Sequence, residues 1–392
     1  MHKGGGSRGI AHDAPLAVAV GVTVMALVVA LLAAAAAAAV ETPPELYHCK
    51  PKEKGLATPP PPPKLPPHVE AQLPATIAAD EFRRVCPPGE VPYPTKSTAP
   101  VKVTPELTRA AAPAGGRVNS RRFSIRTRIP GHRRNRGGHA TASRSELFPG
   151  FWYSHAVGTQ SGLSASKGYN GMWVWQTNEQ PYIPYAENME SSHSLAQIWA
   201  SRQYGGCTST VEIGWTESAG QFKGNYEPHL FISAWDCGVW LGYMSLESPL
   251  WKQSSAVVWP GAVVSHNDKF HAYGARMDGN NWWFYYDGQW VGYIPNSAWK
   301  TLYPSYLTKG QAGGEVATKA LWTCADMGYG GLFGTHPWAA MFSDVWYEFN
   351  YQTQVELAKL QPYATDSSNY NTGNWSEGIP GAEFRYGGPG WC

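Results

Sequence analysis

Two glutamates lie in strand-like surroundings from which their carboxyl groups could do chemistry together. Glu212 lies in Ser-Thr-Val-Glu-Ile-Gly-Trp (209–215), and Glu315 lies in Gly-Gly-Glu-Val (313–316). Two carboxyls that meet in a cleft do not both ionise easily, so one holds a proton while the other stays charged. Such a pair supplies a general acid and a general base from one residue type. We expect the two side chains to share a proton in one pocket.

The local pattern predicts where these side chains point. In an extended 211–215 segment, the valine, isoleucine and tryptophan share one face, and Glu212 shares the other with Gly214. The apolar face would pack into a core, so that Glu212 projects from the opposite face beside a glycine that leaves space above the backbone. The glycines before Glu315 suit a bulge or a close backbone approach. Glutamates in strands are more often solvated charges or salt-bridge partners, so this pattern alone does not establish catalysis.

Composition divides the chain near residue 150. All 18 tryptophans lie from Trp152 onward, whereas 21 of the 32 prolines precede residue 151. The 11 basic and 19 acidic residues of 151–392 give a net charge of −8, while the remaining residues carry +10. The sequence therefore predicts a basic leader followed by an acidic, aromatic-rich domain. That domain is long enough for one sizeable core.

Residues 1–40 are typical of an export signal. Lys3 and Arg8 precede an uninterrupted apolar run at 16–40, which ends in the small residues of 33–39. The run is also long enough to span a bilayer, so a retained signal anchor is the alternative to a cleaved signal peptide. In either case we expect the rest of the protein to be secreted or extracellular. Membrane contact is expected only if the anchor is retained.

Residues 41–150 are typical of a propeptide or linker region that is partly disordered. Five consecutive prolines at 59–63 favour extended polyproline II. Cys49 and Cys86 are the only cysteines before the domain, and they could close a loop. The arginine-rich run at 110–144 could bind nucleic acid or an anionic membrane. In an exported chain we expect instead a solvated, protease-accessible connector and no nucleic-acid partner.

Residues 151–392 show the pattern of short strands and glycine-rich turns. Runs at 269–276, 281–286 and 289–294 are separated by Asp-Gly pairs at 278–279 and 287–288, which predicts a three-strand meander.

Two further segments, 211–215 and 229–235, are expected to pair with each other. Residues 355–360 are the best candidate for a short helix. Repeated short strands with glycine-rich turns predict an all-β fold, either a β-sandwich or a barrel.

A dense aromatic run follows the first turn signal of the meander region and continues past the second. Its members are Trp282, Trp283, Phe284, Tyr285, Tyr286 and Trp290. Alternation along a strand places half of such rings in the core and half on the opposite face. A flat aromatic surface there suits a proline ring and would equally suit a sugar. Our candidate substrate-binding residues are Trp215, Trp282, Trp283 and Tyr285.

The six cysteines of an exported chain are expected to form disulfides rather than metal sites. Neither Cys-x-x-Cys nor His-Glu-x-x-His spacing occurs in the sequence. We therefore expect no metal and no other cofactor. The 12 histidines are expected to be scattered surface or core residues.

From residue 152 to its end, the chain resembles the neprosin domain, a secreted glutamic peptidase family. Several short motifs carry this resemblance in order: 194–199 (SLAQIW), 211–215 (VEIGW), 229–232 (HLFI), 279–283 (GNNWW), 291–295 (VGYIP), 313–315 (GGE), 327–328 (MG), 386–390 (YGGPG) and the last cysteine. The resemblance implies a sandwich of two antiparallel sheets, proteolysis after proline at acidic pH, and a propeptide removed on activation. The family's two catalytic glutamates fall on Glu212 and Glu315.

One departure from the family concerns a disulfide. Plant members have two cysteines after the Phe-Ile-x-Trp strand, whereas 235–240 of this chain contains one. Antiparallel pairing of 209–215 with 229–235 would bring Cys207 next to Cys237 as a replacement. The four cysteines of residues 151–392 allow three connectivities. The one we expect pairs Cys207 with Cys237 and Cys324 with Cys392.

The expected function is that of a secreted, monomeric, acid-active endopeptidase acting through an activated water. Its partners would be a proline-containing peptide or protein substrate and its own propeptide. Loss of the second proton should lower the rate above about pH 6. Two other functions stay open: a non-catalytic carbohydrate- or cell-wall-binding sandwich, and a glycoside hydrolase that uses the same two carboxylates.

Overall fold

The computed structural model describes most of the predicted domain and two segments that precede it. The described residues are 47–61, 85–94, 143–144, 152–184, 192–218, 220–222, 224–243, 248–266, 269–318, 323–333, 339–349, 354–375 and 383–390. The chain divides into units Met1–Glu45 and Leu46–Cys392, and every described residue belongs to the second. The predicted export signal and most of the arginine-rich run lie outside the described residues. Among the described residues, no helix is long and apolar enough to cross a membrane.

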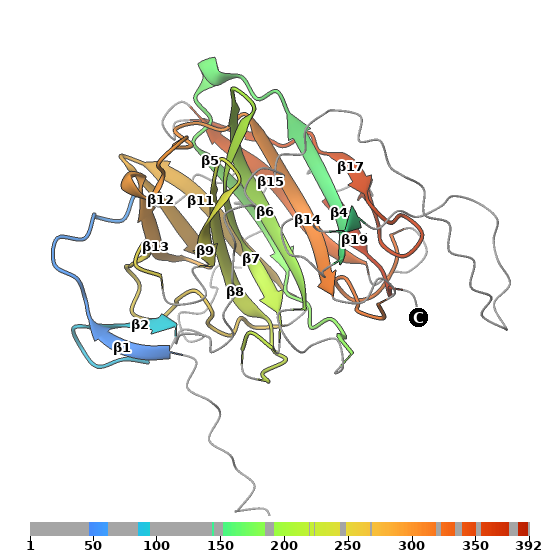
Figure 1. Cartoon of the computed structure of the whole chain (residues 1–392), viewed down its shortest axis with the longest axis horizontal. Helices are drawn as coiled ribbons and strands as arrows, with labels where there is room; N and C mark the ends of the chain where they lie inside the picture. Colours follow the sequence, from blue (N-terminus) through green and yellow to red (C-terminus); the bar gives the residue numbers. More distant parts are fainter. Residues whose placement is uncertain are drawn as a thin grey trace, which may run out of the picture. The chain divides into compact units, whose positions relative to one another are not determined.

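The described part is an antiparallel sandwich, as the sequence predicts (Figure 1). The nine-stranded sheet contains β10 (Lys252–Gln253), β13 (Gln289–Pro295), β12 (Asn281–Tyr286), β11 (Phe270–Asp278), β5 (Gly171–Thr177), β15 (Ala340–Phe349), β19 (Glu383–Gly387) and β18 (Asn371–Trp375) in that order, with β16 (Gln354–Leu357) paired to β15. The eight-stranded sheet contains β17 (Gln361–Ala364), β4 (Trp152–Ser161), β14 (Lys309–Thr318), β6 (His193–Tyr204), β7 (Cys207–Glu217), β8 (His229–Asp236) and β9 (Val239–Tyr243), with β3 (Ser143–Arg144) paired to β4. Two short 3-10 helices are η3 (Ala165–Lys167) and η4 (Asn296–Ala298).

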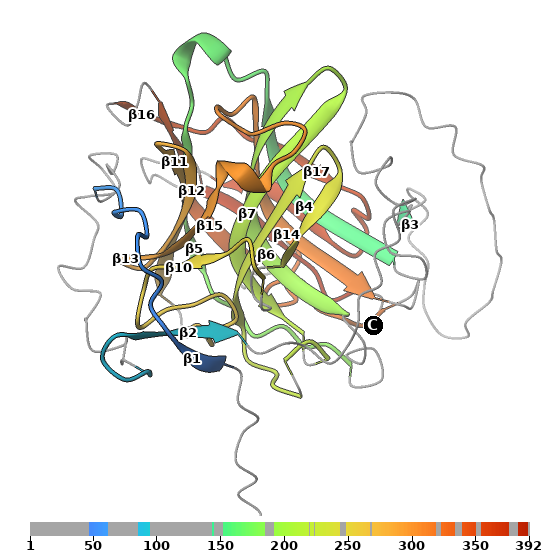
Figure 2. The same ribbon diagram turned by 60° about the vertical axis from the view of Figure 1, so that its left-hand side comes forward.

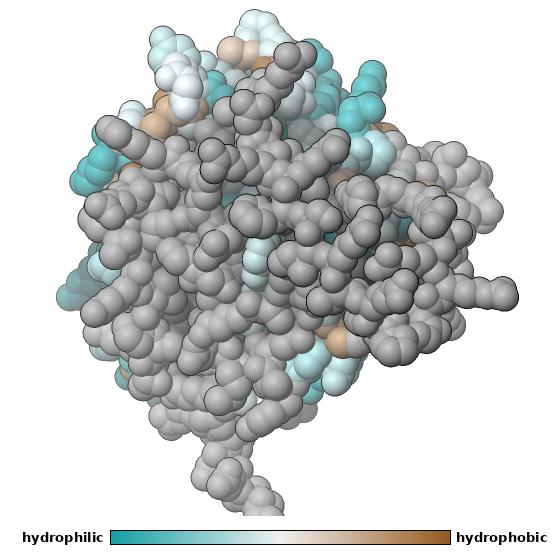
Figure 3. All heavy atoms as spheres, turned by 45° about the vertical axis from the view of Figure 1, so that its right-hand side comes forward, coloured by the Kyte–Doolittle hydropathy of each residue, from teal (hydrophilic) through white to brown (hydrophobic). Residues whose placement is uncertain are grey.

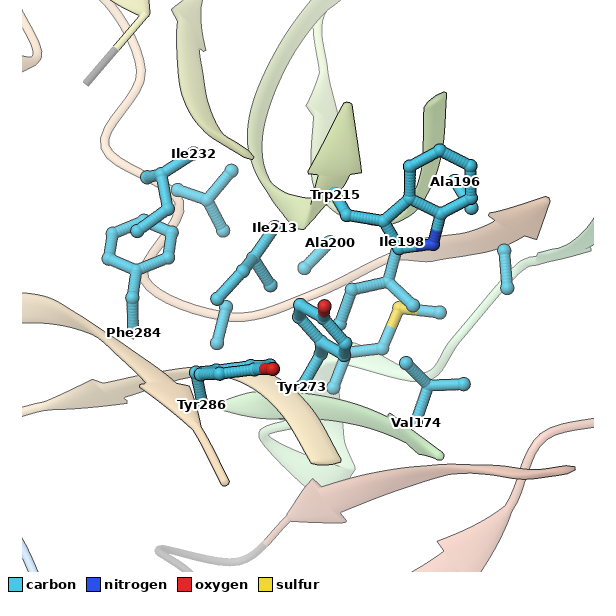
Figure 4. Packing of buried hydrophobic residues seen from close by; sticks show 14 of the residues in the cluster. Val174, Ala196, Ile198, Ala200, Ile213, Trp215, Ile232, Tyr273, Phe284 and Tyr286 are labelled. Atoms are coloured by element: carbon cyan, nitrogen blue, oxygen red, sulfur yellow. The ribbon is translucent and has the colours of Figure 1, made fainter. Parts of the chain in front are cut away.

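The core lies between the two large sheets and is built by alternation along the strands. On β7, Val211, Ile213 and Trp215 are fully buried in this core, as predicted. Figure 4 shows Ile213 and Trp215 facing aromatic residues of the opposite sheet, among them Tyr273 and Phe284. Burying apolar area stabilises a fold by about 25 cal/mol for each Å². Because every second residue is fixed in the core, the residues between must lie on the outer faces.

The surface carries only scattered apolar side chains. Among the described residues, the exposed large hydrophobic side chains are Tyr182, Tyr204, Tyr226, Val239, Val263, Tyr329 and Tyr363, and they are spread along the chain. On the face in Figure 3, most of the described residues that can be seen are hydrophilic. Single exposed hydrophobic residues are ordinary on a protein surface.

The predicted meander is confirmed by β11, β12 and β13. These strands pair antiparallel in chain order. The turn between β12 and β13 consists of Asp287 and Gly288, whose φ angles are 40° and 84°. Two positive φ angles match the twist of the flanking strands, which explains why Asp-Gly forms this turn.

The predicted helix at 355–360 is wrong. Residues 354–357 form the strand β16, which pairs with β15. Val355 and Leu357 both pack against a second apolar cluster on the outer face of the nine-stranded sheet. The apolar spacing of two residues therefore suits a strand, and pairing with an existing sheet edge outweighs the weak local helical tendency.

Disulfides form as the sequence predicts wherever both cysteines are described. Cys207 is bonded to Cys237, with their Cα atoms 4.8 Å apart. The expected register is confirmed as well, because Glu212 of β7 lies opposite Ser233 of β8. Cys324 is also disulfide-bonded, but its predicted partner, Cys392, lies outside the described residues.

Part of the region before the domain is ordered. Strands β1 (Tyr47–Pro51) and β2 (Glu90–Pro94) pair antiparallel in a separate two-stranded sheet. The predicted bond between Cys49 and Cys86 closes this element. Figure 2 shows the two strands below the nine-stranded sheet, with the following segment rising beside β13.

Gly214 allows an unusually close approach of two central strands. A Cβ atom at this position would overlap the carbonyl oxygen of Ala196 and lie 2.6 Å from the Cα of Gln197. The expected free space above this glycine is therefore occupied by the backbone of β6. This finding corrects the interpretation made from the sequence. The glycine is needed for strand packing rather than for a cavity.

We predict that Gly214→Ala lowers the free energy of unfolding by about 3 kcal/mol or more, because the added methyl group meets backbone that cannot rotate away. Gly224→Ala is the control, since the position has open space but a φ of 86°, and its cost should be about 1 kcal/mol. Urea unfolding followed by tryptophan fluorescence measures both. Equal costs for the two variants would contradict the close approach of β6 and β7.

Candidate active site

Glu212 lies on the outer face of the eight-stranded sheet. It is opposite Trp199 of β6 and Ser233 of β8. Its neighbours along the strand, Val211 and Ile213, point into the core. The glutamate side chain must therefore project away from the nine-stranded sheet.

Glu315 lies on the same outer face, two strands away. It is opposite His155 of β4 and Leu195 of β6. Leu195 and Trp199 are four residues apart on β6, and an even spacing along a strand means that both face the same side. Trp199 is opposite Glu212 and Leu195 is opposite Glu315, so the register brings both glutamates to one face.

Strand β6 separates the two glutamates. Two strand spacings amount to roughly 10 Å, and four residues along a strand amount to roughly 13 Å, so the two backbones stand well apart. Within the described residues, no hydrogen bond joins the two carboxyls. The two glutamates therefore share a face of the sheet, but the predicted direct sharing of a proton between their carboxyls is not present.

Gln197 occupies the row halfway between the two glutamates. It is opposite Gly214 on one side and Gly313 on the other. Neither neighbour has a side chain, so the Gln197 amide stands alone in its row on these three strands. The side chain is 2% exposed. Its Oε1 atom, an acceptor, has no hydrogen-bond partner in the described part of the chain, which makes this oxygen available to a hydrogen-bond donor.

Two histidines hold the carboxylate of Glu315. His155 Nε2 lies 2.6 Å from Oε2, and His193 Nε2 lies 3.0 Å from Oε1. Burial alone would raise the pKa of Glu315, but the charge of His155 and the hydrogen bonds from both rings lower it to about 2. Each oxygen of the carboxylate thus has its own partner. Glu315 is ionised at any pH at which the protein is expected to act.

Glu212 has the opposite environment. Burial raises the pKa of Glu212 to about 8, and the negative charge of Glu315 adds to this shift. Ser233 and Trp235 lie beside the carboxyl and act in the opposite direction, but burial outweighs them. Glu212 therefore holds a proton at acidic and neutral pH. The two glutamates differ in protonation because of their separate surroundings rather than through a common proton.

The histidines were missed by the sequence interpretation, which expected scattered residues. His155 is opposite Glu315, and His193 is opposite Ala317, two residues along the same strand. Both therefore lie on the face of Glu315, within reach of its carboxylate. A register for β4, β6 and β14 would have shown this, but the pairing joins segments that are far apart in the sequence. Among the described residues, no group of His, Cys, Asp or Glu side chains is arranged to hold a metal ion.

The four predicted substrate-binding aromatic residues do not line this site. Trp215 and Trp282 are fully buried in the core between the sheets. Their indole N–H groups donate to the carbonyl oxygens of Thr177 and Pro304. The physical reason is strand alternation, which directs both rings inward.

Trp283 and Tyr285 alternate with these core residues. Both belong to the outer face of the nine-stranded sheet, where their rings pack against Trp290. That face belongs to the other layer of the sandwich. The sequence therefore predicted aromatic rings on an outer face, but that face belongs to the sheet that does not carry the glutamates.

Other aromatic side chains do surround the glutamates. Trp199 is half-buried beside Glu212. Trp235 is also half-buried, and its ring centre lies 6.4 Å from that of Trp240 on β9. Near the other glutamate, the Tyr153 ring stacks on His155 with 6.1 Å between ring centres. The site thus consists of one protonated and one ionised carboxyl, with aromatic side chains beside each of them.

Comparison with solved structures gives weak likeness only. A β-glucanase from Bacillus licheniformis matches at a TM-score of 0.28 and 12% identity, over 56% of this chain and 82% of its own. A lichenase from a mouse hindgut metagenome matches at a TM-score of 0.26 and 10% identity, over 47% of this chain and 86% of its own. The galectin LEC-6 of Caenorhabditis elegans matches at a TM-score of 0.23 and 9% identity, over 41% of this chain and 86% of its own. TM-scores this low support no conclusion about activity.

No curated protein matches the chain. The family comparison is more specific, because the Neprosin family model matches residues 190–389, just over half of the chain. That range contains Gln197 and both glutamates of the site. The protein therefore belongs to the neprosin family.

Proposed function

We propose that this protein is a secreted, acid-active glutamic endopeptidase that hydrolyses peptide bonds after proline. Family membership supports a peptidase. The observation that carries the mechanism is the contrast between two carboxyls on one face. Burial keeps Glu212 protonated, while two histidines keep Glu315 ionised. A general acid and a general base are thus available before substrate binds.

In the proposed reaction, Glu315 is the base and Glu212 is the acid. Each carboxylate oxygen of Glu315 has two lone pairs, so that one remains for a water molecule beside each histidine. Glu315 removes a proton from this water, whose oxygen attacks the scissile carbonyl carbon. Glu212 then donates its proton to the departing amine as the carbon–nitrogen bond breaks. The proton gained by Glu315 returns to Glu212 through solvent.

Gln197 is the proposed donor to the tetrahedral intermediate through its Nε2–H groups, and its unpartnered Oε1 would accept from an N–H of the substrate. Its amide lies between the two glutamates, where the carbonyl oxygen of a bound peptide would become negatively charged. The histidines that keep Glu315 ionised also make it a weak base, so stabilisation of the intermediate carries more of the rate. Removing one such donor typically reduces kcat about 100-fold or more.

Specificity for proline is proposed from the family resemblance and from the local aromatic residues. Trp199 is half-buried next to Glu212 and offers a flat apolar surface. A proline ring has an apolar body and its nitrogen carries no proton, so it packs on such a surface without losing a hydrogen bond. We expect Trp199 and Trp235 to contact the residue before the cleaved bond.

The distribution of buried acids supports function at acidic pH. Glu179 is buried against the hydroxyls of Thr177 and Tyr386, and burial raises its pKa to about 8. Burial also raises the pKa of Asp326 to about 6. Together with Glu212, these groups are neutral in acid and become buried charges as the pH rises. Two disulfides are typical of an oxidising, extracellular setting.

We predict that Glu212→Gln and Glu315→Gln each reduce peptidase activity on a proline-containing peptide at about pH 4 by at least 1,000-fold, since acid–base groups contribute 10²–10⁴-fold each. Glu227→Gln is the control because Glu227 is an exposed partner of His266. Mass spectrometry of the digest measures cleavage and its position. Full activity in both folded active-site variants would refute the mechanism. Release of reducing sugar, or polysaccharide binding without proteolysis, would favour the alternative functions.

The pH–rate profile should be broad. Activity should fall as pH rises through about 8, where Glu212 loses its proton, and as pH falls through about 2, where Glu315 gains one. The alkaline limit thus lies above the value of about 6 expected from sequence. In a His155→Gln, His193→Gln variant, the acid limit should move up to or beyond pH 4.5, the ordinary value for a glutamate, because burial then raises the pKa of Glu315 without the opposing histidines. Measuring kcat/KM from about pH 2 to 9 tests both, and an unmoved acid limit would exclude the histidine effect.

Stability should also depend on Glu212. Below pH 4.5, the Glu212 side chain is protonated in both the folded and the unfolded chain. Between pH 4.5 and about 8, only the folded chain keeps the proton. The free energy of unfolding therefore falls by up to about 1.4 kcal/mol for each pH unit in this window. Glu212→Gln should remove this loss and become more stable than the wild type near pH 8. Chemical unfolding at several pH values measures the effect, and parallel curves for both proteins would contradict it.

A further inference from the structure

The outer face of the nine-stranded sheet is an aromatic surface far from any proposed chemistry. Its rings come from alternate positions of β5, β12, β13 and β15: Trp173, Trp175, Trp283, Tyr285, Trp290 and Trp346. A bulge at Val291 turns both Trp290 and Tyr293 to this face. The surface is therefore built by the register of the sheet and not by a loop.

One row of residues crosses this surface from strand to strand. Lys252 of β10 is opposite Tyr293 of β13, which is opposite Trp283 of β12. Trp283 is opposite Arg276 of β11, and Arg276 is opposite Gly171 of β5. The row thus places a cation, a phenol, an indole and a guanidinium in a line across four neighbouring strands.

The segment after β1 follows this row. Glu53 Oε2 lies 2.8 Å from Lys252 Nζ. Four residues later, the backbone N–H of Ala57 donates to the Tyr293 hydroxyl at 3.2 Å. Four residues after that, Arg276 donates from Nη2 to the carbonyl oxygen of Pro61. Figures 1 and 2 both show this blue segment running beside β13.

The spacing fits an extended proline-rich chain. From residue 57 to residue 61, a polyproline II segment rises about 12 Å. The two strand spacings from β13 to β11 amount to about 10 Å. Pro60 is buried while Pro59 and Pro61 are exposed, so one ring of the run packs onto the protein. The fixed φ of proline holds this conformation before contact, which reduces the entropy lost on docking.

The chemistry of the surface also fits such a ligand. Proline residues offer carbonyl acceptors and no backbone N–H, so they need a surface of donors. Arg276 supplies one such donor, to the carbonyl oxygen of Pro61. Arg276 is held in place by Glu348 at 3.4 Å and lies 4.8 Å from the centre of the Trp290 ring.

We propose that this face is a polyproline-binding site whose occupant is the chain's own segment 53–61, and that it retains the N-terminal piece after the chain is cut between residues 95 and 150. The piece would then be a bound subunit of the processed protein. It lies on the opposite layer of the sandwich from Glu212 and Glu315. Retention therefore does not depend on peptidase activity and does not block the glutamates.

The contacts at the site are mostly neutral, which predicts that acid does not release the piece. The pair between Lys252 and Glu53 is partly exposed, at 30% and 43% of the two side chains, so it contributes at most about 1 kcal/mol. The hairpin contributes apolar contacts that acid does not change, because Val91 and Tyr93 are buried in the core cluster and Tyr47 lies 4.8 Å from Trp259 between ring centres. Retention should therefore come from the hairpin and from residues 57–61 together.

The test uses the full chain with a recognition sequence for a site-specific protease placed near residue 120, in a Glu315→Gln background that prevents self-cleavage. After cutting, size-exclusion chromatography at about pH 7 and about pH 4 shows whether the N-terminal fragment elutes with the rest. We expect co-elution at both pH values. Complete separation of the wild-type fragments at about pH 7 would overturn the proposal, and separation confined to about pH 4 would overturn its neutral-contact basis.

Two variants and a control locate the interaction. Replacing Pro59, Pro60 and Pro61 with serine, or Tyr293 with phenylalanine, should speed dissociation of the fragment by about tenfold or more, which corresponds to about 1.4 kcal/mol. Tyr363→Phe is the control, because Tyr363 is 59% exposed on β17 in the other sheet. Thermal unfolding of the uncut chains confirms that each variant folds. Serine and phenylalanine variants that hold the fragment as tightly as the control would show that the proline run is not what is recognised.

Discussion

Strand alternation around the single core is the constraint on which the rest of the structure depends. Every second residue of the central strands is buried between the sheets, as Ile213 and Trp215 are on β7. A shift of one residue would place these side chains in solvent and Glu212 in the core, so the register is strongly held. The same constraint defines two outer faces. One face carries the glutamates, and the other carries the aromatic row.

On the glutamate face, unlike surroundings replace direct contact as the source of different protonation. Glu315 gains two histidine partners, whereas Glu212 gains mainly burial. Opposite charge and hydrogen bonds favour an ionised carboxylate, while removal from water favours a neutral one. Strand β6 lies between the two groups, and Gln197 stands alone in the row between them because its neighbours are glycines.

Strand alternation also builds the aromatic face, on the outer side of the nine-stranded sheet. Trp283 and Tyr285 alternate with core residues of β12, so their place on the outer face follows from the core itself. Arg276 adds the donor that recognises a carbonyl oxygen, and Glu348 compensates its buried charge. A surface of rings and donors suits a segment that offers rings and acceptors. The chain carries such a segment ahead of its folded domain, within reach of the row.

The sequence by itself determined the local features: the Asp-Gly turn at 287–288, the inward face of 211–215, and the two disulfides whose cysteines are all described. Each depends on neighbours in the chain or on one hairpin, where spacing specifies geometry. Only the tertiary structure decided that His155 and His193 bracket Glu315, that Gln197 lies between the glutamates, and that 354–357 is a strand. These outcomes depend on which distant strands pair and in which register, and local propensity carries no information about such pairings.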